Sequence, residues 1–266
     1  MQPQPVSRRH TAPPTIPAVA AVFLGPAGFV MPAIVAVALA AAWACPAAAQ
    51  PAERLRKPSI ADTVRANVYA DNWFILYVNG ELVAVDPIKF LPHNVVSVDL
   101  LPRYPMTIAV MARDNADPKT GMEYANTNIG DGGLILKFGD GTVTDASWKA
   151  RAFSRGPIDG DTRNPRVQSD PIPDDWYAID FDDSDWAGAK EYSEQQIGPK
   201  QPFYEADFAG ARFIWSDDLL LDNTVIFRRR IEAPPDGRPR PDFSRLNDVV
   251  PEGPPKGGRR PRGEGR

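Results

Sequence analysis

The stretch D-N-W-F-I-L-Y-V-N-G-E-L-V-A-V, residues 71–85, decides the fold class of this chain. Asn79-Gly80 separates two apolar runs, and this dipeptide supplies the two positive φ angles of a type I′ hairpin turn. Before the turn, apolar residues occupy both alternating sides of the strand, so we expect both strand faces to be covered. The stretch therefore predicts a hairpin within a β-sandwich.

Other short segments have the alternation and the flanking turn residues of β-strands. These predicted strands are Thr63–Ala70, Val95–Leu101, Met106–Ala112, Leu134–Phe138, Thr142–Thr144 and Val225–Ile231. No segment has a long period of 3.6 residues. The pattern predicts an all-β domain over residues 61–232, a single antiparallel β-sandwich with long loops. The irregular segment 148–201 is expected to wrap this sandwich as loops and short turns.

The N-terminal residues 1–49 have the pattern of an export signal. Arg8-Arg9 precedes a long uncharged stretch that ends in Ala47-Ala48-Ala49. We therefore expect a signal peptide and an exported protein, periplasmic or secreted. The alternative is a membrane anchor, because residues 16–44 are long enough to span a bilayer. A polar lead-in, residues 50–60, follows.

Cysteine and histidine usage limits the chemistry. Cys45 is the only cysteine, and signal cleavage would remove it. The mature chain would then have no cysteine nucleophile, thiolate metal site or disulfide. His93 would be its only histidine, which rules out a multi-histidine metal centre within one chain.

The charge is distributed unevenly along the chain. The whole chain carries a net charge of −4, the body from Gln50 to Glu232 carries −9, and the tail from Ala233 to Arg266 carries +3. The tail is rich in Pro, Gly and Arg, so residues 233–266 are expected to be disordered. An acidic body argues against a nucleic-acid partner and is compatible with divalent cations.

Three segments resemble the galactose-binding-domain-like β-sandwich (jelly-roll) superfamily. They are the hairpin at Asp71–Val83, the turn at Asp180–Trp186, and Phe213–Ser216 with the following Val225–Arg229. The resemblance implies a jelly-roll-like fold that often serves as a carbohydrate-binding or accessory module and often holds a structural calcium ion. It does not imply a shared reaction.

One acidic segment predicts a metal site. Asp114, Asn115 and Asp117 offer hard oxygen ligands within four residues, and Glu123 and Asp131 can add more. Calcium prefers such ligands, so these five residues are the candidate ligands of a structural calcium ion. The alternative is ordinary turn chemistry, in which Asp and Asn side chains cap their own backbone.

Trp176 and Trp186 are the candidate carbohydrate-binding residues. Trp176 follows Pro173-Asp174-Asp175 in the irregular segment, where an exposed ring can stack on a sugar. The alternative is that both rings are core, as we expect for Trp73 and Trp215. Beside Trp186 stands an acidic group whose paired carboxylates suit glycoside hydrolysis, with a structural turn as its alternative; its members are Asp180, Asp182, Asp183 and Asp185.

The sequence favours an exported non-catalytic binding module for carbohydrate, with calcium in a structural role. No catalytic residue is assigned, since no nucleophile motif such as G-x-S-x-G accompanies His93. One alternative is an envelope structural or assembly protein that docks on a partner. Another is a hydrolase that uses the acidic group near Trp186.

Overall fold

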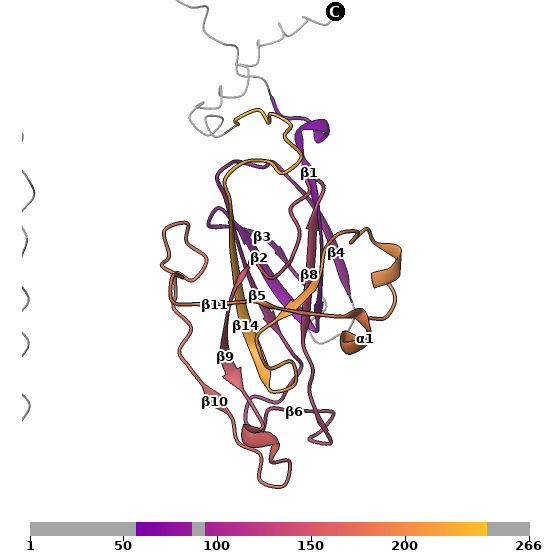
Figure 1. Ribbon diagram of the computed structural model, residues 1–266, viewed down its shortest axis with the longest axis vertical. Helices are drawn as coiled ribbons and strands as arrows, with labels where there is room; N and C mark the ends of the chain where they lie inside the picture. Colours follow the sequence, from indigo (N-terminus) through magenta and orange to yellow (C-terminus); the bar gives the residue numbers. More distant parts are fainter. Residues whose placement is uncertain (1–56, 87–93, 244–266) are drawn as a thin grey trace, which may run out of the picture. The chain divides into compact units, whose positions relative to one another are not determined.

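The computed structural model describes residues 57–86 and 94–243, in which two large antiparallel β-sheets pack face to face and β6 and β7 form a separate two-stranded sheet (Figure 1). This is the all-β antiparallel sandwich that the alternating segments predict. The strands are β1 (Val64–Asp71), β2 (Trp73–Val78), β3 (Glu81–Val85), β4 (Val95–Leu100), β5 (Met106–Arg113), β6 (Met122–Glu123), β7 (Asn128–Ile129), β8 (Gly133–Phe138), β9 (Lys149–Arg155), β10 (Gln168–Ser169), β11 (Ala187–Gly188), β12 (Lys190–Tyr192), β13 (Phe213–Trp215) and β14 (Asp222–Ile231).

Helical elements in the described part are short. They are the 3₁₀ turns η1 (Ile60–Asp62), η2 (Ile158–Gly160) and η3 (Phe203–Glu205), and the single α-helical turn α1 (Glu194–Ile197). Within the described residues, no helix is both long and apolar enough to cross a membrane. The anchor and signal predictions for residues 1–49, and His93, lie outside the described residues.

The two sheets have different strand orders. The five-stranded sheet runs β12-β13-β8-β1-β4, and the seven-stranded sheet runs β10-β9-β14-β5-β2-β3, with β11 also paired to β9. In Figure 1, β1, β4 and β8 lie on one side of the sandwich, and β2, β3, β5, β14 and β9 lie on the other. The longest pairing joins β14 to β5, from Thr224 opposite Arg113 to Ile231 opposite Met106.

The predicted hairpin is present as β2 and β3. Asn79 has φ 51° and Gly80 has φ 78°, as the type I′ turn requires. The inward face of β2 is fully buried, and Phe74 and Leu76 on it are 0% exposed. The outward face is half-buried, since the ring of Tyr77 stacks on that of Tyr177 with centroids 4.2 Å apart. Another part of the chain therefore covers each face of this strand.

The main core fills the space between the sheets. It contains residues from β1, β2, β5, β8 and β14, together with the fully buried indoles of Trp148 and Trp215. The Nε1 atom of Trp148 donates to the carbonyl of Val143 at 2.9 Å, and that of Trp215 donates to the carbonyl of Asp222 at 2.9 Å. The two large apolar rings are thus buried with their polar atoms satisfied.

Two smaller apolar clusters cover the outer faces of the sheets. Tyr69 and Phe213 of the five-stranded sheet pack against Phe203 and Phe208 from the connection before β13. On the seven-stranded sheet, the 170–186 segment packs Trp176 and Trp186 over β5, β9 and β14. The prediction that long loops wrap the sandwich is therefore correct for this segment.

The structure also differs from the sequence predictions in three places. Residues 149–155 form the interior strand β9, although the segment from Trp148 was expected to be loops. Thr142–Thr144 does not form a strand and contributes only an isolated bridge between Val143 and Lys137. Residues 233–243 belong to the described part, and the amide of Asp236 donates to the carbonyl of Asp140 at 2.9 Å. The start of the predicted disordered tail thus contacts the sandwich.

Candidate functional site

Polar side chains gather at one end of the sandwich, where several strands begin or end. β1 ends at Asp71, β5 ends at Arg113 just before Asp114, and β8 begins at Gly133. Asp71 is paired with Gly133, and the amide of Asn72 donates to the carbonyl of Arg113 at 2.9 Å. These pairings bring residues from distant parts of the sequence to one end of the molecule.

The β6–β7 hairpin adds Glu123 to this end. Glu123 is paired with Asn128, and its carbonyl accepts from the amide of Thr127 at 3.0 Å. Figure 1 shows β6 at the lower end of the view. At the tip of the hairpin, the exposed Tyr124 has a φ of 48°, a left-handed value that costs a non-glycine residue about 1 kcal/mol.

Asp114 is the central residue of the site. It is 2% exposed, and within the described residues neither of its carboxylate oxygens accepts from an N–H or hydroxyl donor. Its polar neighbour is the carboxyl group of Glu123, with which Asp114 can share a proton when one of the two is protonated. The backbone of Gly130 approaches it closely, because a Cβ atom on Gly130 would lie 1.8 Å from Oδ2 of Asp114. Glycine is therefore required at position 130 to leave room for the carboxylate.

Burial and mutual repulsion make these carboxylates difficult to ionise. Burial, followed by the charges of Asp131 and Glu123, raises the pKa of Asp71 to about 7. Burial, the adjacent Glu123 carboxyl group and the charges of Asp131 and Asp71 raise the pKa of Asp114 well above its usual range. The pKa of Glu123 is also raised, chiefly by burial. We call Asp71, Asp114, Glu123 and Asp131 the acidic cluster.

The structure brings together only part of the predicted metal-ligand set. Asp114, Glu123 and Asp131 act on one another electrostatically, as their raised pKa values indicate. Asp117 follows the turn alternative, because its Oδ1 accepts from the amides of Lys119 at 2.8 Å and Thr120 at 3.2 Å. Asn115 contributes its backbone amide to Oδ1 of Asn72 at 2.7 Å.

Sequence reasoning missed Asp71 as a member of the cluster. It lies at the end of β1, in the very stretch that predicts the hairpin, and is 3% exposed. An acidic residue at the end of an otherwise apolar strand was the available signal. The pairing of β1 with β8, which places it near Asp131, is not visible in the sequence.

The cluster suits a hard divalent cation in its donor chemistry. It offers carboxylate oxygens only, and the two unpartnered oxygens of Asp114 are the kind of buried acceptors that a cation would satisfy. Among residues 57–86 and 94–243, no three His, Cys, Asp or Glu side chains form a ready-made ligand set. A bound cation would therefore draw on backbone carbonyls or water in addition to these carboxylates.

The two predicted carbohydrate-binding tryptophans are both buried. Trp176 is 6% exposed and packs edge-on to Tyr77, with ring centroids 5.3 Å apart. Trp186 is 4% exposed and lies against Phe153 and Phe181 at 5.8 and 5.5 Å. The expectation that their rings lie open to a sugar is therefore wrong. Both instead cover apolar surface of the seven-stranded sheet, which is the core alternative.

The acidic group near Trp186 has structural roles. The carboxylate of Asp183 accepts from Nε of the buried Arg228 at 2.7 Å. Oδ1 of Asp182 accepts from the amide of Ser184 at 3.0 Å, which closes the turn. Asp185 lies 3.7 Å from the guanidinium of Arg151, at the exposed surface. These contacts match the structural-turn alternative.

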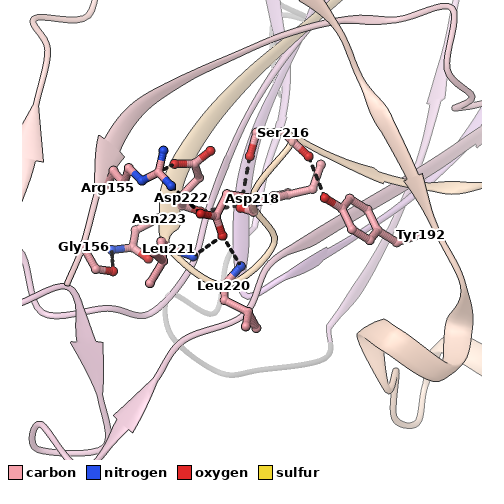
Figure 2. Close-up of polar contacts among 10 residues, drawn as sticks. Arg155, Gly156, Tyr192, Ser216, Asp218, Leu220, Leu221, Asp222 and Asn223 are labelled. Carbon is pink, nitrogen blue, oxygen red and sulfur yellow. Dashed lines mark hydrogen bonds and ion pairs between the residues drawn. The ribbon is translucent and has the colours of Figure 1, made fainter. Parts of the chain in front are cut away.

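The start of β14 is fixed by a polar network next to the acidic cluster (Figure 2). The carboxylate of Asp218 accepts from Arg155 and from the amides of Leu220 and Leu221. Nδ2 of Asn223 donates to the carbonyl of Gly156 at 3.1 Å. The carbonyl of Asn223 accepts from the amide of Asp114 at 3.0 Å. This network positions the backbone that follows β5.

Comparison with protein-family models, with curated proteins and with solved structures finds no match to this chain.

Proposed function

We propose that this chain is an exported, non-catalytic carbohydrate-binding module, and that a calcium ion bound at the acidic cluster stabilises the end of its sandwich. The observation that carries the proposal is Asp114, a buried carboxylate with two unpartnered oxygens among three other carboxylates. An isolated buried charge costs several kcal/mol, so this carboxylate must be protonated or neutralised by a cation.

The position of the cluster explains what the ion would stabilise. Its members come from the end of β1, the residue after β5, the β6–β7 hairpin and the segment before β8. A cation shared among them would join side chains from four segments that are distant in the sequence. The carbohydrate part of the proposal draws support from the resemblance to galactose-binding-like modules and from the sandwich architecture.

Calcium binding can be tested by thermal and chemical unfolding of the full chain in EDTA and in calcium chloride. Calcium at one hundred times its dissociation constant should stabilise the fold by about 2.7 kcal/mol. Asp114→Asn should abolish this gain and, in EDTA, stabilise the protein by about 1 kcal/mol, because it removes a buried ionisable group. Magnesium should be a weaker substitute, since it demands a smaller octahedral site.

Asp117→Asn is the matched control, because Asp117 only caps its own turn. It should retain the calcium response. An equal loss of response in both variants, or no response in the wild-type chain, would contradict the calcium site. Retention of the full chain on insoluble polysaccharides or on a glycan array tests the carbohydrate part, and an absence of binding with calcium present would overturn it.

A further inference from the structure

A row of hydrogen-bonding side chains crosses the outer face of the seven-stranded sheet near the acidic cluster. Arg113 of β5 is opposite Thr224 of β14, Thr224 is opposite Ser154 of β9, and Ser154 is opposite Ser169 of β10. Directly opposed residues of antiparallel strands point to the same face. The row therefore presents one guanidinium and three hydroxyl groups across four adjacent strands.

A β-bulge adds an aromatic ring to this row. The register of β9 and β14 shifts between Ala152 opposite Val225 and Ser154 opposite Thr224, so that Phe153 is the extra residue. Bulges redirect side chains and are common beside binding sites. Phe153 belongs to the apolar cluster on the outer face, and it borders the same cavity as Ser154.

This cavity has a volume of about 270 Å³. Asp170 and Ile172, which follow β10, border it on one side, and residues 116–118, which follow β5, border it on the other. Its wall thus combines an apolar part with donors and acceptors placed around it. Its volume lies slightly below the roughly 300–1,000 Å³ of sites for drug-sized ligands, so it suits a single small ring.

The guanidinium of Arg113 is the unusual group in this wall. Its Nε atom is buried without a hydrogen-bond partner, and the side chain makes no ion pair to any residue in the described part of the chain. Arg155, two strands away, differs because it is paired with Asp218. A half-buried arginine without a carboxylate partner needs an acceptor from a ligand or from water.

We propose that this cavity is the carbohydrate subsite of the module and that it takes one neutral hydroxylated ring, a single pyranose unit. A sugar hydroxyl can accept from Arg113 and donate to Asp170 at once, while the carbon face of the ring lies against the partly exposed side chain of Ile172. The carboxylates of Asp117 and Asp170 border the same cavity and disfavour an anionic sugar. The inference rests on the proposed function and gives it a location and a ligand class.

The location also links the two parts of the proposed function. Asp114 belongs both to the acidic cluster and to the cavity border, and residues 116–118 lie between Asp114 and Glu123 in the chain. A cation at the cluster would fix this part of the wall. Removal of calcium should therefore weaken sugar binding even though the ion need not touch the sugar.

Saturation-transfer NMR with the full chain in calcium tests the subsite. The probes are glucose, galactose, mannose, xylose and rhamnose as neutral sugars, and glucuronate and galacturonate as acidic sugars. At least one neutral sugar should give a signal that Arg113→Ala and the cavity-filling Ser154→Leu each reduce at least tenfold. Arg230→Ala is the control and should leave the signal unchanged, because Arg230 is half-exposed, pairs with Glu232 at the surface and does not border the cavity.

The outcomes distinguish a failure of the proposed subsite from a failure of the proposed carbohydrate-binding function. Circular dichroism and the calcium response of each variant show whether it is folded, and the two variants remove binding by different means. Sugar signals that persist in both folded variants would overturn the subsite, and so would signals from the acidic sugars alone. Polysaccharide binding that survives both variants would place the carbohydrate site elsewhere while the proposed function stands.

Discussion

Two buried ionisable residues of this molecule, Arg228 and Asp114, differ in how the fold satisfies their polar atoms. Arg228, in the middle of β14, has a side chain that is 3% exposed and donates to Asp183 and to the carbonyls of Trp176 and Ala178. Its guanidinium also lies 5.0 Å from the ring centre of Phe181. Asp114, at the end of the sandwich, is 2% exposed, and among the described residues its oxygens accept from no N–H or hydroxyl donor and face the carboxyl group of Glu123.

This difference distinguishes a structural residue, Arg228, from a candidate ion-binding residue, Asp114. The three hydrogen-bond acceptors of the Arg228 side chain all come from the 170–186 segment, so the arginine holds that segment against the sheet and its charge is satisfied. Asp114 is buried at a cost that its neighbours increase, since they carry the same sign of charge. A charge left unsatisfied by the fold marks the place where an added ion would change the free energy most.

Replacing Arg228 should give the largest effect. Arg228→Ala should lower the free energy of unfolding by about 3–5 kcal/mol, because it leaves Asp183 and two backbone carbonyls without their donor. Urea denaturation measures this change. Arg230→Ala, on the same strand but half-exposed, should change stability by less than about 0.5 kcal/mol. An equal change in the free energy of unfolding in both variants would contradict the structural role assigned to Arg228.

The free energy of unfolding should depend on pH because the carboxyl groups of the acidic cluster are difficult to ionise in the folded chain. The pKa of Asp71 is raised to about 7 in the folded chain, against about 3.9 in an unfolded chain. The folded state therefore binds this proton more tightly, and the associated stability, complete below about pH 4, is lost as the pH rises through 7. In EDTA, the contribution of Asp71 to the free energy of unfolding should fall by about 4 kcal/mol from pH 4 to pH 8.

Asp71→Asn isolates that contribution, because the amide cannot ionise and its oxygen can still accept from Asn72. The difference in free energy of unfolding between wild type and Asp71→Asn should therefore change with pH by the amount that Asp71 contributes. Calcium should flatten the slope, since a bound cation favours the charged carboxylate. A wild-type chain that becomes more stable relative to the variant as the pH rises in EDTA would contradict the raised pKa.

A methyl group placed against Asp114 should have the smallest effect on stability and a clear effect on calcium. Gly130→Ala should cost about 2 kcal/mol, because the new Cβ atom would overlap Oδ2 of Asp114. It should also remove the calcium response by displacing that carboxylate. Gly139→Ala is the control, because the nearest atom to its Cβ would be 3.7 Å away, and it should be close to neutral in both measurements. An unchanged calcium response in Gly130→Ala would argue that Asp114 does not bind the ion.

Some features of the fold could be predicted because they depend on short stretches of chain. The Asn79-Gly80 turn requires only two residues that tolerate positive φ, and the strands around it require only local alternation. Strand β9 was missed because its sequence, K-A-R-A-F-S-R, has small and charged residues in place of β-branched ones. Its pairing with β14 overrides that weak preference.

The tryptophans show a second limit of sequence reasoning. Trp176 lies among Pro and Asp residues, a context typical of an exposed loop, and yet its ring is buried on Tyr77. The outer face of β2 is apolar, so it was predicted to be covered by another segment. The ring of Trp176 provides part of that cover. Sequence alone shows that a face requires a cover, but it does not show which segment supplies it.

The sequence by itself determined the all-β class, the hairpin at residues 71–85 and the acidic character of the segment around Asp114, because these depend on local periodicity, turn chemistry and composition. Only the tertiary structure decided that Asp71 joins Asp114, Glu123 and Asp131. It also decided that Arg113, Thr224 and Ser154 form one row. Such convergence depends on strand pairing between distant parts of the chain, which fixes register through long-range burial rather than through neighbouring residues.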